Sequence, residues 1–255
     1  MLEIYQELAS IISKGERAVL ATVVSSHGST PRRAGAKMLI KRDDIFIGTV
    51  GGGGVEQQVK EKAIELMNSG ETQIMHFDLS GRGEEATMIC GGQMEVFLEP
   101  IRPPETLYLF GAGHISESTA TMGKMLGFRV IVIDPRPEYN NIGRFPEADS
   151  LVVEEYESAF PKLDVGRDSY IVIYTTGHIL DERCLHFAAG TEAKYIGMIG
   201  SEKKVKKVKE RLLQKGILKK QLDRVHAPIG IDISAETPQE IAISILAEMI
   251  KVKKA

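Results

Sequence analysis

Two glycine-rich segments precede expected helices, and both could bind an anion. They are "GTVGGGGVEQQ" at 48–58 and "FGAGHIS" at 110–116. Glycine costs conformational entropy, so such a run is typical where the backbone needs positive φ angles or approaches a ligand closely. The free N–H groups and the dipole at a helix N-terminus favour an anion there. The pattern predicts two ligand sites, or one site to which both loops contribute.

The second segment has the spacing of a dinucleotide-binding loop. Gly111, Gly113 and Ser116 follow an expected strand and open an expected helix, and Asp134 ends the next strand 21 residues after Gly113. Gly111 allows the tight turn, Gly113 allows a pyrophosphate to approach, and the acid accepts a hydrogen bond from a ribose hydroxyl. The spacing indicates a Rossmann-like fold. NAD(P), another adenine nucleotide or no nucleotide remain alternatives, and Arg136 could instead meet a 2′-phosphate.

Two histidines are candidates for ligand contact in this half of the chain. His114 follows Gly113 directly, and His178 follows an expected strand end, where ligands bind in open α/β sheets. An imidazole there could hydrogen-bond a ligand or move a proton. The alternative for His114 is a solvent-facing residue at a helix start. We expect Asp181, just beyond His178, to be the N-cap of the following helix.

The first segment has arginines on a preceding loop that could reach it. Arg32 and Arg33 lie in "HGSTPRRAGA", and a guanidinium binds phosphate through two parallel hydrogen bonds. The candidate anion-binding backbone is the run Gly51, Gly52, Gly53 and Gly54. From spacing alone, two solvated arginines and a glycine turn that serves packing are the favoured interpretation.

Cys90 and Cys184 are the two cysteines of the sequence. Cys90 precedes two glycines in an expected loop, where a thiolate could contact a ligand, although a small buried residue is the alternative. Cys184 occupies an apolar helix position and is expected in the core. No two histidines have the spacing of zinc ligands, so we expect no protein-bound metal.

Composition indicates an ordinary globular protein. The chain has 255 residues, 43% of them hydrophobic, and a formal net charge of −3. This charge gives no reason to expect a nucleic acid or a membrane surface as a partner. The sequence has no apolar run long enough for a transmembrane helix and no signal peptide, so we expect a cytoplasmic protein with reduced thiols.

The expected elements divide the chain into two domains. In residues 1–100, a helix over 2–14, a strand around 17–26, two short strands within 37–50, a helix after the glycines and two alternating strands predict an α+β domain with a largely antiparallel sheet. Residues 101–105, "IRPPE", contain two consecutive prolines and are expected to form a linker. Residues 106–255 then alternate strand and helix, which predicts a Rossmann-like domain with a parallel sheet. The chain is therefore expected to be an α/β protein.

Several motifs occur together and in order along the chain. They are "GSTPRRAGAKMLI", "GTVGGGGVEQQV", "CGGQMEVFLEP", "FGAGHIS", "VIDPRPEY", "YIGMIGSEKK" and "HAPIGIDISAETPQEIAISILAEMI". In this the sequence resembles the xanthine dehydrogenase accessory factor (XdhC/CoxI) family over nearly its whole length. The resemblance implies a family-specific N-terminal domain, a C-terminal Rossmann domain, and binding of molybdenum cofactor as cargo.

The resemblance also implies partners and sharpens the site residues. The cargo would be delivered to a xanthine dehydrogenase-type molybdenum hydroxylase, with a cysteine desulfurase as sulfur donor, and a homodimer is the expected assembly. A bound pterin phosphate would give Arg32, Arg33 and the glycine run a function, and Cys90 could contact molybdenum or the dithiolene sulfurs. Many relatives have cysteine where this chain has Gly54, so the resemblance does not carry cofactor sulfuration over to this chain.

Two other classes of function remain open. The Rossmann half is compatible with an NAD(P)-dependent oxidoreductase, although the sequence offers no defined catalytic pair such as Tyr-x-x-x-Lys beside the loop. It is also compatible with a non-catalytic nucleotide sensor that acts on a partner. The resemblance favours an accessory protein over an enzyme.

Overall fold

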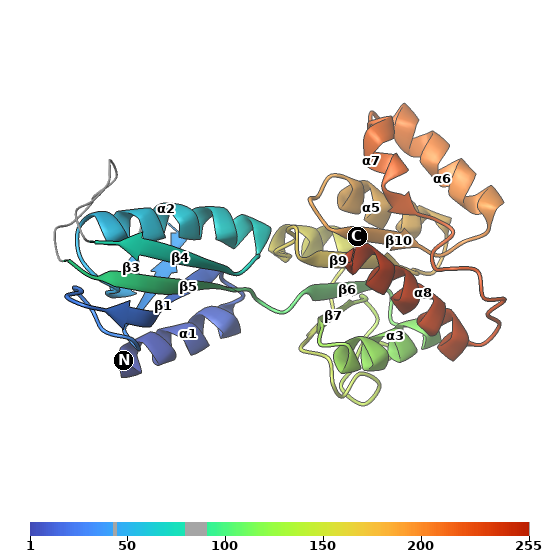
Figure 1. Ribbon diagram of the computed structural model, residues 1–255. Coiled ribbons are helices and arrows are strands. Elements are labelled where there is room, and N and C mark those ends of the chain that lie inside the picture. The colour runs from blue at the N-terminus through green and yellow to red at the C-terminus, as the bar shows by residue number, and fades with distance from the viewer. Residues whose placement is uncertain (43–44, 80–90, 255) are drawn as a thin grey trace. The chain divides into compact units, whose positions relative to one another are not determined.

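The computed structural model describes residues 1–42, 45–79 and 91–254 (Figure 1). Contacts divide the chain into two compact units, Met1–Pro103 and Pro104–Ala255, and each is described by itself. Within the described part of the chain, no helix combines the length and the apolarity needed to cross a membrane.

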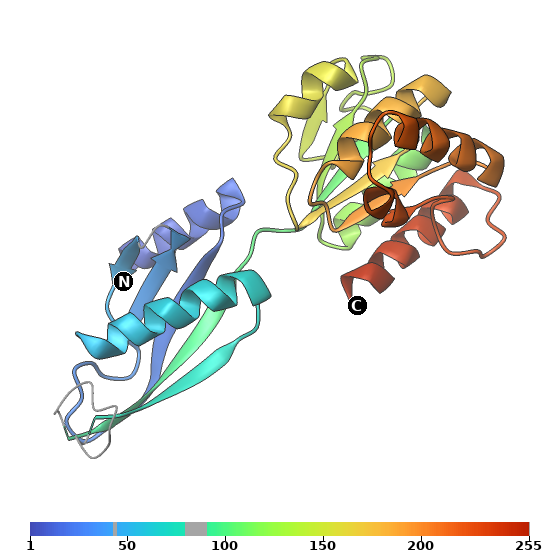
Figure 2. The ribbon, with the colours of Figure 1, turned by 90° about the horizontal axis from the view of Figure 1, so that it is seen from above.

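The first unit contains an antiparallel sheet with strand order β3-β2-β1-β5-β4. Its helices are α1 (Leu2–Lys14) and α2 (Gly54–Ser69), and its strands are β1 (Ala18–His27), β2 (Lys37–Lys41), β3 (Phe46–Gly48), β4 (Gln73–Asp78) and β5 (Gln93–Ile101). The two helices lie on opposite faces of the sheet (Figures 1 and 2). The α+β domain with an antiparallel sheet that the sequence predicts is confirmed.

Alternation along β1 explains why both faces are covered. Ala18 and Leu20 pack with Ile4 and Ile11 of α1, whereas Val19 and the next alternate residues pack with the apolar side of α2. Successive side chains of a strand point to opposite faces, so one apolar strand can serve two cores. The sheet is thus held from both sides, and its connecting loops project from its ends.

The second unit contains a parallel sheet with strand order β11-β10-β9-β6-β7-β8. Its strands are β6 (Thr106–Phe110), β7 (Arg129–Ile133), β8 (Ser150–Val152), β9 (Ser169–Ile173), β10 (Tyr195–Met198) and β11 (Val225–His226). Its α-helices are α3 (His114–Met125), α4 (Tyr156–Ala159), α5 (His178–Ala189), α6 (Glu202–Gln214), α7 (Lys219–Asp223) and α8 (Pro238–Lys253), and a 3₁₀ turn, η2, covers Phe160–Lys162. The predicted Rossmann-like fold is confirmed.

Both faces of the parallel sheet are buried under helices. Leu107 and Leu109 of β6 belong to one core with residues of α3 and α8, and Tyr108 and Phe110 belong to a second core with residues of α5 and α6. The near-continuous apolar strands are typical of a parallel sheet with helices on both sides. The strand side chains face these two cores, so a ligand would meet the loops at the ends of the strands.

One expectation about an element boundary is wrong. Asp181 is not a helix N-cap, because α5 begins three residues earlier, at His178, with Gly177 as its N-cap at a φ of 98°. A glycine at positive φ turns the chain into the helix without a side-chain cap. The short elements β8, α4, η2, α7 and β11 are not predicted from the sequence, because they carry too few residues for a periodic pattern.

Candidate functional site

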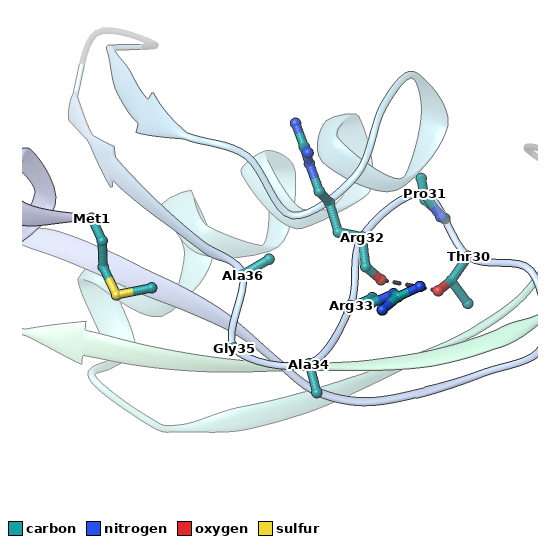
Figure 3. A pocket seen from close by; sticks show the side chains of 8 residues that line it. All are labelled: Met1, Thr30, Pro31, Arg32, Arg33, Ala34, Gly35 and Ala36. Atoms are coloured by element: carbon teal, nitrogen blue, oxygen red, sulfur yellow. Dashed lines mark hydrogen bonds between the residues drawn. The ribbon is translucent and has the colours of Figure 1, made fainter.

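In the first unit, the loop that carries the two arginines connects β1 to β2. Its residues Thr30 to Ala36 line an open hollow together with Met1 (Figure 3). The Thr30 hydroxyl donates to the backbone oxygen of Arg32 at 3.0 Å, and the Val23 backbone oxygen accepts the N–H of Gly35 at 2.8 Å. These bonds fix the turn at both ends and leave the side chains between them outside.

The glycines after Cys90 lie against the start of this loop. A Cβ atom on Gly92 would lie 2.4 Å from the backbone oxygen of Ser29 and 2.5 Å from that of His27. A Cβ on Gly28 would lie 3.2 Å from the backbone oxygen of Gly91. Only glycine allows the two backbones to approach this closely. The contact brings the "CGG" motif and the "GSTPRRAG" motif together.

The glycine run lies against the same loop from another side. A Cβ on Gly51 would lie 3.3 Å from the side chain of Pro31, the residue that directly precedes the two arginines. Gly53, the N-cap of α2, has a φ of 55° and a ψ of −122°, a conformation that essentially only glycine adopts. Glycine is therefore required at Gly53 by the backbone conformation, and it is favoured at Gly51 by the close contact with Pro31.

Thr49 and Glu56 hold the turn into α2, a pairing that the sequence analysis did not predict. The Thr49 hydroxyl contacts the Glu56 carboxylate, and it lies 2.6 Å from the backbone oxygen of Gly51. Glu56 is in the first turn of α2. A Thr seven residues before a Glu, across a glycine run, is a signal that could have suggested this brace.

The two arginines are available for a ligand. Both are exposed, and their side chains point in different directions from the loop (Figure 3). Among the described residues, neither guanidinium has an ion-pair partner. Cys90 lies outside the described residues. The structure therefore brings Arg32, Arg33, the glycine run and Gly91 to one end of the sheet.

In the second unit, the predicted residues gather where the strand order reverses. From β6 the chain proceeds outward through β7 and β8, and β9, β10 and β11 then fill the other side. Ligands of open α/β sheets bind at the carboxyl ends of the strands at this point. Gly111 has a φ of 112°, and a Cβ there would lie 2.7 Å from the backbone oxygen of Tyr174. The loops after β6 and β9 are therefore in contact.

Two helices of equal length begin at these loops. Gly113 is the N-cap of α3 and Gly177 that of α5; neither helix has a side-chain cap, and His114 and His178 are their first residues. Both imidazoles are exposed, and nothing lies within 4 Å of a Cβ built on Gly113. The N–H groups at the start of α3 are open to an anion.

Asp134, the expected ribose acceptor, is buried and already bonded. Its carboxylate accepts the backbone N–H groups of Ala112 at 2.9 Å and Arg136 at 3.0 Å. It also accepts Nε of Arg136 at 2.9 Å and Nη2 of Arg136 at 2.7 Å. Burial alone would raise the pKa of the Asp134 carboxyl, but these hydrogen bonds together lower the pKa below its usual range.

Arg144 holds Ala112 through its carbonyl oxygen, and sequence reasoning did not identify this arginine. Its Nη1 donates to the backbone oxygen of Ala112 at 2.8 Å, and its Nη2 donates to Glu117 at 2.8 Å. The guanidinium groups of Arg136 and Arg144 lie 4.3 and 5.4 Å from the ring centre of Tyr139. The middle residue of the Gly111–Gly113 loop is thus fixed at both its N–H and its carbonyl oxygen.

Lys204 of α6 forms an ion pair with a buried carboxylate. Its Nζ lies 2.5 Å from Oδ2 of Asp181, whose Oδ1 accepts the Thr175 hydroxyl at 2.8 Å. Asp181 is fully buried, and the Lys204 side chain is 18% exposed. Lys204, three residues after the N-cap Ser201, lies near the side of α6 that buries Val205 and Val208. This position on the helix could have indicated from the sequence that Lys204 is partly buried.

Cys184 is fully buried, and burial is the main cause that raises the pKa of its thiol, so it is a core residue. Among the residues that the structure describes, no group of three or more His, Cys, Asp or Glu side chains is placed to hold a metal ion.

Comparison with known proteins identifies the family. The model of the XdhC Rossmann domain matches residues 107–249, and that of the XdhC and CoxI family matches residues 11–78. The fold and both matches define a two-unit protein whose second unit is an XdhC-type Rossmann domain. This chain belongs to the XdhC/CoxI family.

Three curated relatives align over most of this chain. An uncharacterized protein of Escherichia coli, YqeB, is 34% identical over 99% of this chain, which spans only 46% of YqeB. A probable xanthine dehydrogenase subunit of Bacillus subtilis is 25% identical over 97% of this chain and 96% of its own length. The molybdenum cofactor insertion chaperone PaoD of Escherichia coli is 25% identical over 95% of this chain and 85% of its own length.

A solved structure shares the fold. It is described as a xanthine dehydrogenase from Bacillus halodurans and is 24% identical, with a TM-score of 0.53; the match covers 98% of this chain and 96% of that one. At this identity the likeness concerns the arrangement of the elements and not the ligand.

Proposed function

We propose that this protein binds molybdenum cofactor in its first unit and delivers it to a xanthine dehydrogenase-type molybdenum hydroxylase. The single observation that carries the proposal is the convergence of three family motifs on the β1–β2 loop. Gly92 and Gly28 join two of these motifs, and Gly51 and Pro31 join the third. The relative named as a molybdenum cofactor insertion chaperone supports the choice of cargo.

The exposed groups at this end of the sheet suit the charged part of the cargo. Arg32 and Arg33 offer planar donor pairs to a phosphate, and arginine is weakly hydrated, so an ion pair with phosphate costs less desolvation than one with lysine. The glycine run keeps side chains away from the start of α2, where N–H groups add to the binding. Cys90 supplies a soft sulfur ligand for the molybdenum side of the cargo.

Gly54 separates binding from sulfur transfer in this chain. It is the first residue of α2, where a thiol would be activated by the helix N-terminus, and glycine offers no sulfur. The chain therefore acts in binding and handing over the cofactor, and a sulfur atom reaches the cofactor from another protein such as a cysteine desulfurase.

The test is an anaerobic titration of the full chain with molybdenum cofactor. We compare the wild type with Arg32→Ala/Arg33→Ala and with Arg167→Ala/Arg183→Ala, which removes two exposed arginines of the second unit that pair with Glu192 and Glu157. Each lost charge-assisted hydrogen bond costs about 1.5–3 kcal/mol, so the first variant should bind at least tenfold more weakly. Equal affinity in all three proteins refutes the arginine site, and absence of binding by the wild type refutes the proposed function.

A further inference from the structure

A dinucleotide that sits on a Rossmann loop needs two things from the protein. Its pyrophosphate needs open N–H groups at the helix start, and its adenosine ribose needs a carboxylate with unused acceptor positions at the end of the second strand. The first need is met here, because space around Gly113 is open. The second is not met, because the Asp134 carboxylate is fully buried and accepts four N–H groups.

We propose that Arg136 closes the ribose position and makes the Rossmann unit of this protein discriminate against NAD(H) and NADP(H). Its guanidinium covers both carboxylate oxygens of Asp134 in a bidentate arrangement, which is the strong geometry for this pair. A carboxylate has about four acceptor sites, and all four are in use. A ribose diol can therefore bind Asp134 only after it displaces the side chain of Arg136.

Displacement is unfavourable for both forms of the cofactor. A diol offers two neutral donors in exchange for a charged fork, so its hydrogen bonds to the carboxylate lack the ion-pair attraction that the guanidinium supplies. A 2′-phosphate could draw Arg136 away, but it would then stand beside the uncovered negative charge of Asp134, and like charges in a poorly solvated site repel strongly. The stacking of the Arg136 guanidinium on the Tyr139 ring adds to the resistance.

Asp134 consequently acts as a positioning residue for the loop. Its bond to the N–H of Ala112, together with the Arg144 bond to the Ala112 oxygen, fixes the turn between Gly111 and Gly113 without a nucleotide. In the dinucleotide-binding pattern, the same carboxylate would accept hydrogen bonds from the ligand. Here it accepts hydrogen bonds from Ala112 and Arg136.

The experiment is a fluorescence titration of the full chain with NADH and NADPH. The variants are Arg136→Ala, which uncovers the carboxylate while the two backbone N–H donors to Asp134 remain, and Arg136→Gln, which keeps a neutral donor in case the first variant folds poorly. The double variant Asp134→Asn/Arg136→Ala removes the uncovered charge. Arg167→Ala is the matched control, because Arg167 is exposed and pairs with Glu192 on the surface of the same unit.

We expect wild type and control to bind NADH with a Kd above about 1 mM, and Arg136→Ala to bind at least tenfold more tightly. We expect the double variant to lose this gain, because the acceptor is then an amide. Wild-type binding in the micromolar range overturns the proposal, as does NADH affinity that is unchanged in both single variants. A double variant that binds as tightly as Arg136→Ala overturns the role given to the carboxylate.

Discussion

Substitution of Gly92 by alanine tests whether the contact between two motifs at the β1–β2 loop matters. Gly92 is absent from the positive-φ glycines, so alanine is allowed by its backbone conformation. The added Cβ would nevertheless lie 2.4 Å from the Ser29 oxygen and 2.8 Å from the Thr30 side chain. These distances are about 1 Å shorter than a normal contact, so one backbone must move.

The neighbouring glycine provides a matched control. Gly91 has a φ of 79°, and nothing lies within 4 Å of a Cβ built there. Alanine at Gly91 therefore costs about 1 kcal/mol of backbone strain without a clash. Overpacking at Gly92 costs about 1–3 kcal/mol, and the shift falls on Ser29 and Thr30, next to Pro31 and the arginines.

The assays are urea denaturation and anaerobic titration with molybdenum cofactor. We expect both variants to lose stability, but only Gly92→Ala to bind the cofactor at least tenfold more weakly, because only this change displaces the arginine loop. If Gly92→Ala binds like the wild type while its loss of stability is measurable, the loop moved without consequence. The convergence of the motifs would then have no part in binding.

Three further predictions concern single side chains. Lys204→Met leaves the buried Asp181 charge without its partner and should lower the free energy of unfolding in urea by about 3 kcal/mol, whereas Lys206→Met, at an exposed position of α6, should change it little. Gly54→Cys should give a thiol that reacts faster with iodoacetamide than cysteine in unfolded protein, because the start of α2 favours the thiolate; equal rates would refute this. The lowered pKa of Asp134 stabilises the native state above the ordinary carboxyl pKa of about 3.9, and this contribution is lost as the pH falls through the native value. The difference in unfolding free energy between wild type and Asp134→Asn should therefore shrink between about pH 7 and pH 3, and a difference that grows in acid would contradict the assignment.

The sequence predicts the long elements because their patterns repeat. Helix α1 ends at Gly15 in the left-handed conformation, as its glycine suggests, and α8 begins with the capping box of Thr237 and Glu240. The start of α5 is not predicted, since Gly177 begins this helix with no sequence signal beyond its own flexibility. The periodic elements were thus predictable, and the start of α5 was not.

The site was predictable as a set of residue types but not as a set of bonds. The spacing of Gly111, Gly113 and Asp134 is that of a dinucleotide site, and the fold around them agrees with the spacing. The spacing of these residues does not show whether the Asp134 carboxylate is free for a ribose or is bound by a side chain of the protein. Arg136 lies two residues after Asp134, close enough to fold back onto it. The sequence would be the same if the arginine faced a 2′-phosphate instead.

The two arrangements of Arg136, on Asp134 or facing a 2′-phosphate, differ in the conformation of one side chain. That conformation affects what the whole unit can bind. With Arg136 turned outward, the unit has an open acid and resembles a nucleotide-binding domain. With Arg136 turned onto Asp134, the acid organises Ala112, and the loop is fixed before any ligand arrives. Because both states contain the same motif, the motif identifies the fold, and the partner of its acid decides whether the fold can accept the ribose of a dinucleotide.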